Sequence, residues 1–218
     1  ELMQGVLPDA SAFLVSGLAS RRWYSEAVIV EKAEPAGQFG ASRDEAGRRF
    51  ETMLRETGGR FQATLPPKAR EALSFFTART RQHLPADIGI ELRSNIPWGK
   101  GLSSSSADVL SVLSLVNDYL GTGLSAGELY QIAARVEPTD PCLSEDIVVF
   151  HQHIGRPGAV IEMPPVTLLY FDAAPGRQVD TLGMRRRRMD GEGKFFAWLL
   201  QRLVRAAKAG DYEVVFDT

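Results

Sequence analysis

The chain has 218 residues, enough for one large domain or two small ones. Its 25 basic and 27 acidic residues give a formal net charge of -2, which does not favour nucleic-acid binding. The basic run Arg185–Arg188 is interpreted as a solvated loop. No apolar stretch approaches the roughly 20 residues that span a bilayer, so no membrane partner is expected. The single cysteine, Cys142, excludes an intrachain disulfide and predicts a cytoplasmic location.

The first half of the chain is predicted to combine several strands with one long helix. Pro66-Pro67 favours a helix start, and apolar residues at helical spacing extend this helix to Thr80. Alternating apolar and polar residues, or runs of apolar residues, indicate the strands. The expected strands cover residues 13–15, 23–30 and 87–95, and a loop leading into a helix is expected at 35–49.

The second half is predicted to contain more helix. An apolar stripe predicts a helix over Ala107–Leu120 that ends at Gly121. Ser125 to Glu128 has the spacing of a capping box and predicts a further helix, which Pro138 ends at Glu137. Strands are expected at 147–150, 159–161 and 166–172, a helix at 195–209, and a strand-like run at 212–216. This irregular mixture favours an α+β fold over a doubly wound sheet.

The segment Pro97–Ala107, here named the serine loop, lies between a predicted strand and a predicted helix. It contains Gly99, Lys100, Gly101 and the four serines Ser103–Ser106. Glycines let the backbone approach a phosphate, and the N–H groups at a helix start favour negative charge. The lysine adds a cation, and the hydroxyls can bind phosphate or Mg²⁺. The serine loop therefore predicts a nucleotide-binding site.

The commonest motifs of this kind do not match the serine loop. The Walker pattern requires glycine at the position of Ser94 and Ser or Thr at the position of Gly101. The dinucleotide fingerprint requires glycine at the position of Ser104. The loop also lacks the Gly-x-Ser-x-Gly of a hydrolase nucleophile elbow.

A second candidate group is Glu137-Pro138-Thr139-Asp140, here named the acidic corner. Phosphoryl transfer to an alcohol uses one carboxylate to hold Mg²⁺ and another to accept or orient the hydroxyl proton. Two carboxylates on a corner stiffened by proline can divide these tasks. By itself the pattern is also typical of an ordinary surface helix end.

The pattern Pro97-x-x-x-Gly101-Leu102-x-Ser104-Ser105-x-Ala107 resembles the second motif of the GHMP small-molecule kinases. Ser103 stands where that family has glycine, and Ser106 where it often has alanine. The segments Glu1–Gly5 and Glu137–Asp140 extend the resemblance to the L-threonine kinases of cobalamin biosynthesis, over residues 1 to roughly 172.

This resemblance implies a GHMP-kinase-like two-layer α+β fold with an N-terminal nucleotide-binding part and a C-terminal α/β part. It places an ATP-binding domain at 1–142 and an α+β domain at 143–218. It implies an ATP- and Mg²⁺-dependent kinase that phosphorylates the side-chain hydroxyl of a small-molecule amino acid, L-threonine, to give O-phospho-L-threonine. Exposed strands are compatible with a homodimer.

The resemblance also assigns roles to residues. Asp140 is the implied base or orienting group, and Lys100 acts with it in catalysis. The implied metal ligands are the Ser105 hydroxyl and Glu137, and the implied substrate-binding residues are Glu1, Gln4 and Thr139. Trp98 either flanks the adenine or packs under the loop. The implied nucleotide-binding residues are Pro97, Trp98, Gly99, Lys100, Gly101, Leu102, Ser103, Ser104, Ser105 and Ser106.

Two alternative functions stay open. One is a kinase of the same superfamily that acts on homoserine or another small alcohol. The other is a regulatory module that binds ATP without transferring its phosphate. The family's third, C-terminal Gly-rich motif is absent from the sequence. Either the chain is cut short or, as we expect, a segment is missing before Phe216-Asp217-Thr218.

Overall fold

The computed structural model describes residues 3–16, 23–31, 60–62, 65–164, 172, 176–178 and 192–217. The chain divides into two compact units, one made of Glu1–Ala19 with Ala126–Thr218 and the other of Ser20–Ser125. The predicted loop at 35–49, most of the predicted strand at 166–172 and the basic run at 185–188 lie outside the described residues. Within the described ranges, none of the helices combines the length and apolar character needed to cross a membrane.

The unit Ser20–Ser125 is built on a three-stranded antiparallel sheet. The strand order is β3 (Ser25–Glu31), β5 (Ile88–Ser94) and β4 (Arg60–Gln62). The register of β3 and β5 pairs Ile29 with Ile90.

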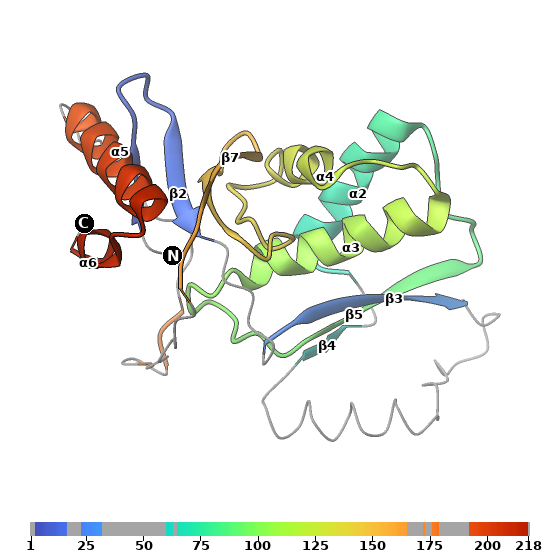
Figure 1. Cartoon of the computed structure of the whole chain (residues 1–218). Helices are drawn as coiled ribbons and strands as arrows, with labels where there is room; N and C mark the ends of the chain where they lie inside the picture. Colours follow the sequence, from blue (N-terminus) through green and yellow to red (C-terminus); the bar gives the residue numbers. More distant parts are fainter. Residues whose placement is uncertain are drawn as a thin grey trace. The chain divides into compact units, whose positions relative to one another are not determined.

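Two helices complete this unit. The helix α3 (Ser104–Leu120) packs against β3 and β5, and α2 (Pro67–Thr80) packs against α3 (Figure 1). Proline at the start of α2 fits there because the first helical N–H has no intrahelical acceptor. The buried face of α3 follows the predicted helical stripe and includes Val109, Leu110, Val112, Leu113 and Val116.

The other unit contains a four-stranded antiparallel sheet whose strands come from distant parts of the sequence. Their order is β1 (Met3–Val6), β2 (Ala12–Ser16), β6 (Ile147–His151) and β7 (Arg156–Ile161). Gly5 of β1 faces α5: a Cβ on it would lie 2.5 Å from Cδ1 of Phe196.

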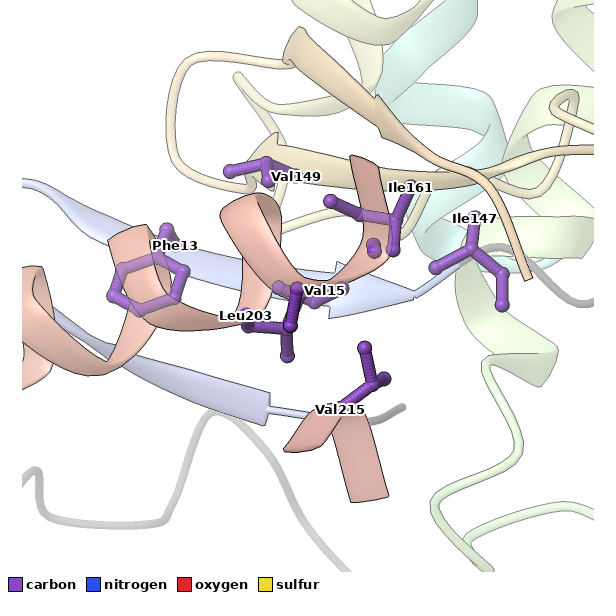
Figure 2. Packing of buried hydrophobic residues seen from close by; sticks show 9 residues of the cluster. Phe13, Val15, Ile147, Val149, Ile161, Leu203 and Val215 are labelled. Atoms are coloured by element: carbon purple, nitrogen blue, oxygen red, sulfur yellow. The ribbon is translucent and has the colours of Figure 1, made fainter. Parts of the chain in front are cut away.

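One face of this sheet is covered by α5 (Gly193–Ala209) and α6 (Tyr212–Phe216). Figure 2 shows the resulting core, in which alternate residues of the strands meet the two helices. Its members include Phe13, Val15, Ile147, Val149, Ile161, Leu203 and Val215.

The opposite face of the same sheet contacts α4 (Ala126–Ala133), which packs near β7. Phe150 meets Tyr130 of α4 edge to face, with ring centroids 5.0 Å apart. Its register partner Leu14 is 1% exposed. Because both faces of β2 are buried, its sequence is a continuous apolar run rather than an alternation.

The structure confirms a mixture of helices and sheets, but it corrects two details. Helix α4 ends at Ala133, and turns continue to Val136, whose N–H bonds to the carbonyl of Ala133 three residues back. The run Tyr212–Phe216 is a helix, not a strand, because the Asp211 side chain caps it. The N–H of Asp217 bonds to the carbonyl of Glu213, as in the last turn of a helix.

The sheet also bears on the predicted domain boundary between residues 142 and 143. Strands β6 and β7 lie after that boundary, yet β6 pairs with β2 from the beginning of the chain. The compact units therefore follow strand pairing rather than a single cut in the sequence.

Candidate functional site

The backbone of the serine loop alternates between positive and negative φ. Gly99, Gly101 and Ser103 have φ values of 66°, 71° and 59°, whereas the intervening Lys100 and Leu102 are not in the positive region. Such alternation turns successive N–H groups toward one concave side, which favours an anion. Ser103 adopts the left-handed conformation that glycine prefers, at the position where the GHMP motif has glycine.

The serines of the loop differ in accessibility. Ser104 and Ser106 are 6% and 4% exposed, and they face the interior of their unit. Ser105, between them, is only half-buried, and so is Lys100. Ser105 is therefore the serine of the first helical turn that is best placed to meet a ligand.

Trp98 is exposed in this segment. Its exposed fraction is 58%, which does not fit packing under the loop. The adjacent Pro97 is half-buried. A large exposed aromatic ring beside a phosphate-type loop is suited to contact a flat ligand group.

Hydrogen bonds anchor the base of the serine loop to β3. The backbone N–H of Tyr24 donates to Oδ1 of Asn95 over 2.8 Å, and the N–H of Asn95 donates to the carbonyl of Tyr24 over 3.2 Å. Partial burial raises the pKa of the Tyr24 phenol, and the charge of Glu26 raises it further. These bonds fix the point at which the chain leaves β5.

A second anchor holds the start of α3. Ser25 Oγ donates to Oδ1 of Asp108 over 2.7 Å, and Ser111 Oγ donates to the carbonyl of Ser25 over 2.7 Å. Asp108 is 4% exposed. Sequence reasoning missed this network, although an acidic residue within the apolar stripe of a helix could have indicated a buried partner.

The acidic corner follows α4 and is held by the turn between β6 and β7. The N–H of Thr139 donates to the carbonyl of Gln152 over 3.0 Å. Glu137 is 6% exposed, and Asp140 is half-buried. Thr139 is 1% exposed, and its Oγ1 has no hydrogen-bond partner among the described residues.

Tyr130 bonds to the segment that follows this corner, and Gly155 packs closely against α4. The Tyr130 hydroxyl accepts the N–H of Leu143 over 2.9 Å. Burial raises the pKa of Tyr130 to about 12, although the bond from Leu143 acts in the opposite direction. Gly155, with φ 61°, lies so close to α4 that a Cβ would be 2.2 Å from the Tyr130 carbonyl oxygen.

The candidate residues fall into two separate sets. The serine loop belongs to the unit Ser20–Ser125, and the acidic corner belongs to the other unit together with Gln4, which is exposed on β1. Glu1 lies outside the described residues. The residues of the serine loop lie within one unit, and those of the acidic corner lie within the other.

The chemistry of the proposed metal ligands fits Mg²⁺. Ser105 and Glu137 both offer oxygen atoms, and Mg²⁺ binds proteins through few such ligands while phosphates and water supply the others. The described residues contain no group of three or more His, Cys, Asp or Glu able to hold a metal ion by themselves.

Comparison with known proteins identifies one family. Residues 68–146 match the family described as GHMP kinases N terminal domain. An L-threonine kinase of Salmonella typhimurium is 30% identical over 92 residues, which cover 42% of this chain and 31% of that protein.

Kinases with other names also match. A 4-diphosphocytidyl-2-C-methyl-D-erythritol kinase of Bordetella parapertussis is 33% identical over 91 residues, covering 42% of this chain and 30% of that protein. A homoserine kinase of Desulfitobacterium hafniense is 42% identical over 50 residues, covering 23% and 17%. The matched part spans about a third of the L-threonine kinase. Residues 68–146, which include both the serine loop and the acidic corner, match the GHMP kinase N-terminal domain family.

Proposed function

We propose that this chain transfers the γ-phosphoryl group of ATP to the side-chain hydroxyl of a small amino acid, L-threonine, as a step of cobalamin synthesis. The observation that carries the proposal is the serine loop with its alternating φ values inside a segment that matches GHMP kinases. The name of the Salmonella typhimurium relative, L-threonine kinase, supports threonine as the acceptor.

In this proposal the serine loop binds the nucleotide. The N–H groups of Gly99–Gly101 and of the first turn of α3 hold the β- and γ-phosphates, and the Lys100 ammonium neutralises charge that develops on the transferred group. Trp98 lies against the adenine. The anchoring of the loop through Asn95 and Asp108 keeps these donors in place before ATP arrives.

The acidic corner positions the acceptor. Asp140 accepts or orients the proton of the acceptor hydroxyl, and Thr139, Gln4 and Glu1 contribute to the acceptor site. In a loose phosphoryl transfer, orientation contributes more than proton removal. Ser105 and Glu137 would hold Mg²⁺, which when bound neutralises phosphate charge.

The proposed domain organisation follows the family. Residues 1–142 form the ATP-binding part and 143–218 the C-terminal part of a GHMP-type two-layer fold. The proposed partners are a small-molecule substrate and, for the assembled enzyme, a second copy of the chain. The proposed location is the cytoplasm.

A second candidate function is phosphorylation of homoserine or another small alcohol. The name of the Desulfitobacterium hafniense relative, homoserine kinase, favours this function. The third is an ATP-binding regulatory module. Such a module does not need the carboxylate of Asp140, so that residue separates binding from transfer.

Release of ADP in the presence of ATP and Mg²⁺ tests these alternatives. The acceptors are L-threonine, L-serine, L-homoserine, mevalonate and 4-diphosphocytidyl-2-C-methyl-D-erythritol. L-threonine should give a kcat/KM about tenfold or more above L-serine, because a pocket built for one methyl group discriminates by that amount. Higher turnover of homoserine contradicts the threonine assignment, and ATP binding without turnover of any acceptor favours the regulatory module.

Asp140→Asn should lower kcat about 100-fold or more and leave the Kd of ATP within about twofold. Asp146→Asn is the matched control, because Asp146 is an exposed aspartate of the same segment outside the proposed site. Loss of ATP affinity in the Asp140 variant would refute the division of roles. Ser105→Ala should raise the Mg²⁺ concentration needed for half-maximal rate, and an unchanged requirement removes Ser105 as a ligand.

A further inference from the structure

A row of stacked side chains lies on α5, outside both sets of candidate residues. The rings of Phe195 and Trp198 stack with centroids 6.2 Å apart and an interplanar angle of 25°. Cζ of Arg202 lies 5.6 Å from the centroid of the Trp198 ring. Phe195 and Trp198 are 56% and 53% exposed, so this row faces solvent.

Beside this row, α5 and α6 border a hollow of about 340 Å³. Its apolar lining comes from Ala206, Ala209 and Val214 together with the Trp198 ring. Sites for small organic ligands have volumes of roughly 300 to 1,000 Å³ and combine apolar lining with a few polar groups. The hollow therefore has room for a small ligand.

Charges of both signs also line the hollow. Arg202 and Arg205 are the cations and Asp211 is the anion. In the part of the chain that the structure describes, no ion pair joins these three residues. They lie around one hollow without neutralising one another.

Two of these charged groups are held in place by their neighbours. Stacking on Trp198 orders the Arg202 guanidinium and leaves the N–H donors at its edge able to bind a carboxylate. Oδ1 of Asp211 accepts the N–H of Val214 over 3.2 Å and so caps α6. The second carboxylate oxygen can meet another donor.

We propose that this hollow binds a small zwitterion with an apolar side chain, of which an α-amino acid is the simplest example. The two arginines would receive its carboxylate, Asp211 its ammonium group, and Val214 with the two alanines its side chain. A simple anion would leave Asp211 without a partner, and a simple cation would meet the like charges of the two arginines. The site goes beyond the proposed phosphotransferase function and does not depend on it.

Isothermal titration of the full chain, without ATP, tests this inference with three probes. L-Phenylalanine should bind saturably, whereas N-acetyl-L-phenylalanine lacks the ammonium group and L-phenylalaninamide lacks the carboxylate. Each derivative should bind about fivefold or more weakly, as expected when one charged hydrogen bond at a partly exposed site is lost. Equal or tighter binding of either derivative overturns the zwitterion assignment, and so does the absence of saturable binding by L-phenylalanine.

Variants locate the binding and separate it from the proposed acceptor site. Arg205→Gln should weaken the binding of L-phenylalanine about fivefold or more. Lys208→Gln is the matched control, because it removes the same charge from an exposed position of α5 outside the hollow. It should change the affinity less than about twofold. Asp211→Ser removes the acidic charge and keeps a side chain that can cap α6, so it should also weaken binding.

Equal effects of Arg205→Gln and Lys208→Gln would show diffuse attraction and overturn the site. Unchanged affinity in both Arg205→Gln and Asp211→Ser would place the ligand elsewhere and overturn it as well. Helical circular dichroism checks that each variant is folded. No probe is phosphorylated in the titration. Its result therefore stands even if the enzymatic test shows no release of ADP.

Discussion

Replacement of Gly155 by alanine tests how the turn between β6 and β7 supports the acidic corner. At this position a Cβ would lie 2.2 Å from the carbonyl oxygen of Tyr130 and 2.6 Å from the backbone nitrogen of Gln131. These are backbone atoms, so no side-chain rotation relieves the clash. The Tyr130 carbonyl also accepts the N–H of Ala134 over 2.8 Å, and movement of the helix end would disturb that bond.

The expected loss of stability has two parts. The φ of 61° costs a non-glycine residue about 1 to 2 kcal/mol, of which about 0.4 to 1 kcal/mol is recovered because alanine restricts the unfolded chain. Displacing closely packed backbone costs a further 1 to 3 kcal/mol, roughly as overpacking does elsewhere. Gly155→Ala should therefore lower the free energy of unfolding by about 2 to 4 kcal/mol.

Urea denaturation followed by circular dichroism at 222 nm measures this loss. Gly210→Ala is the matched control, because Gly210 belongs to the same unit and has φ 69°, but a Cβ there meets nothing within 4 Å. The control should lose only about 1 kcal/mol, since it has the strain without the clash. If Gly155→Ala loses no more than Gly210→Ala, the close approach of the turn to α4 does not exist in solution and the reasoning is refuted.

Two further predictions concern buried polar groups. The pKa of Tyr130 is raised to about 12, so the folded state keeps its proton when the unfolded state releases it near pH 10. This stabilisation, about 3 kcal/mol, is fully present below pH 10 and is lost as the pH rises toward 12. Tyr130→Phe should flatten that part of the stability profile. Asp108→Ala and Ser25→Ala should each lower the free energy of unfolding by about 1 to 3 kcal/mol. A double-mutant cycle in urea should give a coupling energy of about 1 kcal/mol between them. Additive losses would contradict the hydrogen bond between Ser25 and Asp108.

Local sequence patterns were sufficient for most helices and strands. The stripe from Ala107 to Leu120 and the proline pair before α2 predicted their helices because both signals depend on neighbouring residues. The prediction of a strand at Tyr212–Phe216 was wrong. Its β-branched and aromatic residues favour a strand, whereas Asp211 caps a helix whose Val215 packs into the core.

The serine loop could be predicted because its chemistry is contiguous in the sequence. Its anchors could not, since Ser25 and Asp108 are 83 residues apart and no local pattern connects them. The hydrogen bond between Thr139 and Gln152 could not be predicted either, because it depends on where the turn after β6 folds back.

The pairing of β2 with β6 has a consequence for the order in which the chain acquires structure. Leu14 and Phe150 are register partners, so a ribosome working at 5 to 20 residues per second needs roughly 7 to 27 s between them. An isolated two-stranded hairpin is at best marginally stable in water, so the apolar face of β1 and β2 waits unpaired during that interval. The continuous unit Ser20–Ser125 needs no later strand and can fold first. Nascent chains stalled before Ile147 should therefore expose Phe13 and Val15 to chaperones, whereas the full chain, in which α5 and α6 cover these residues, should not.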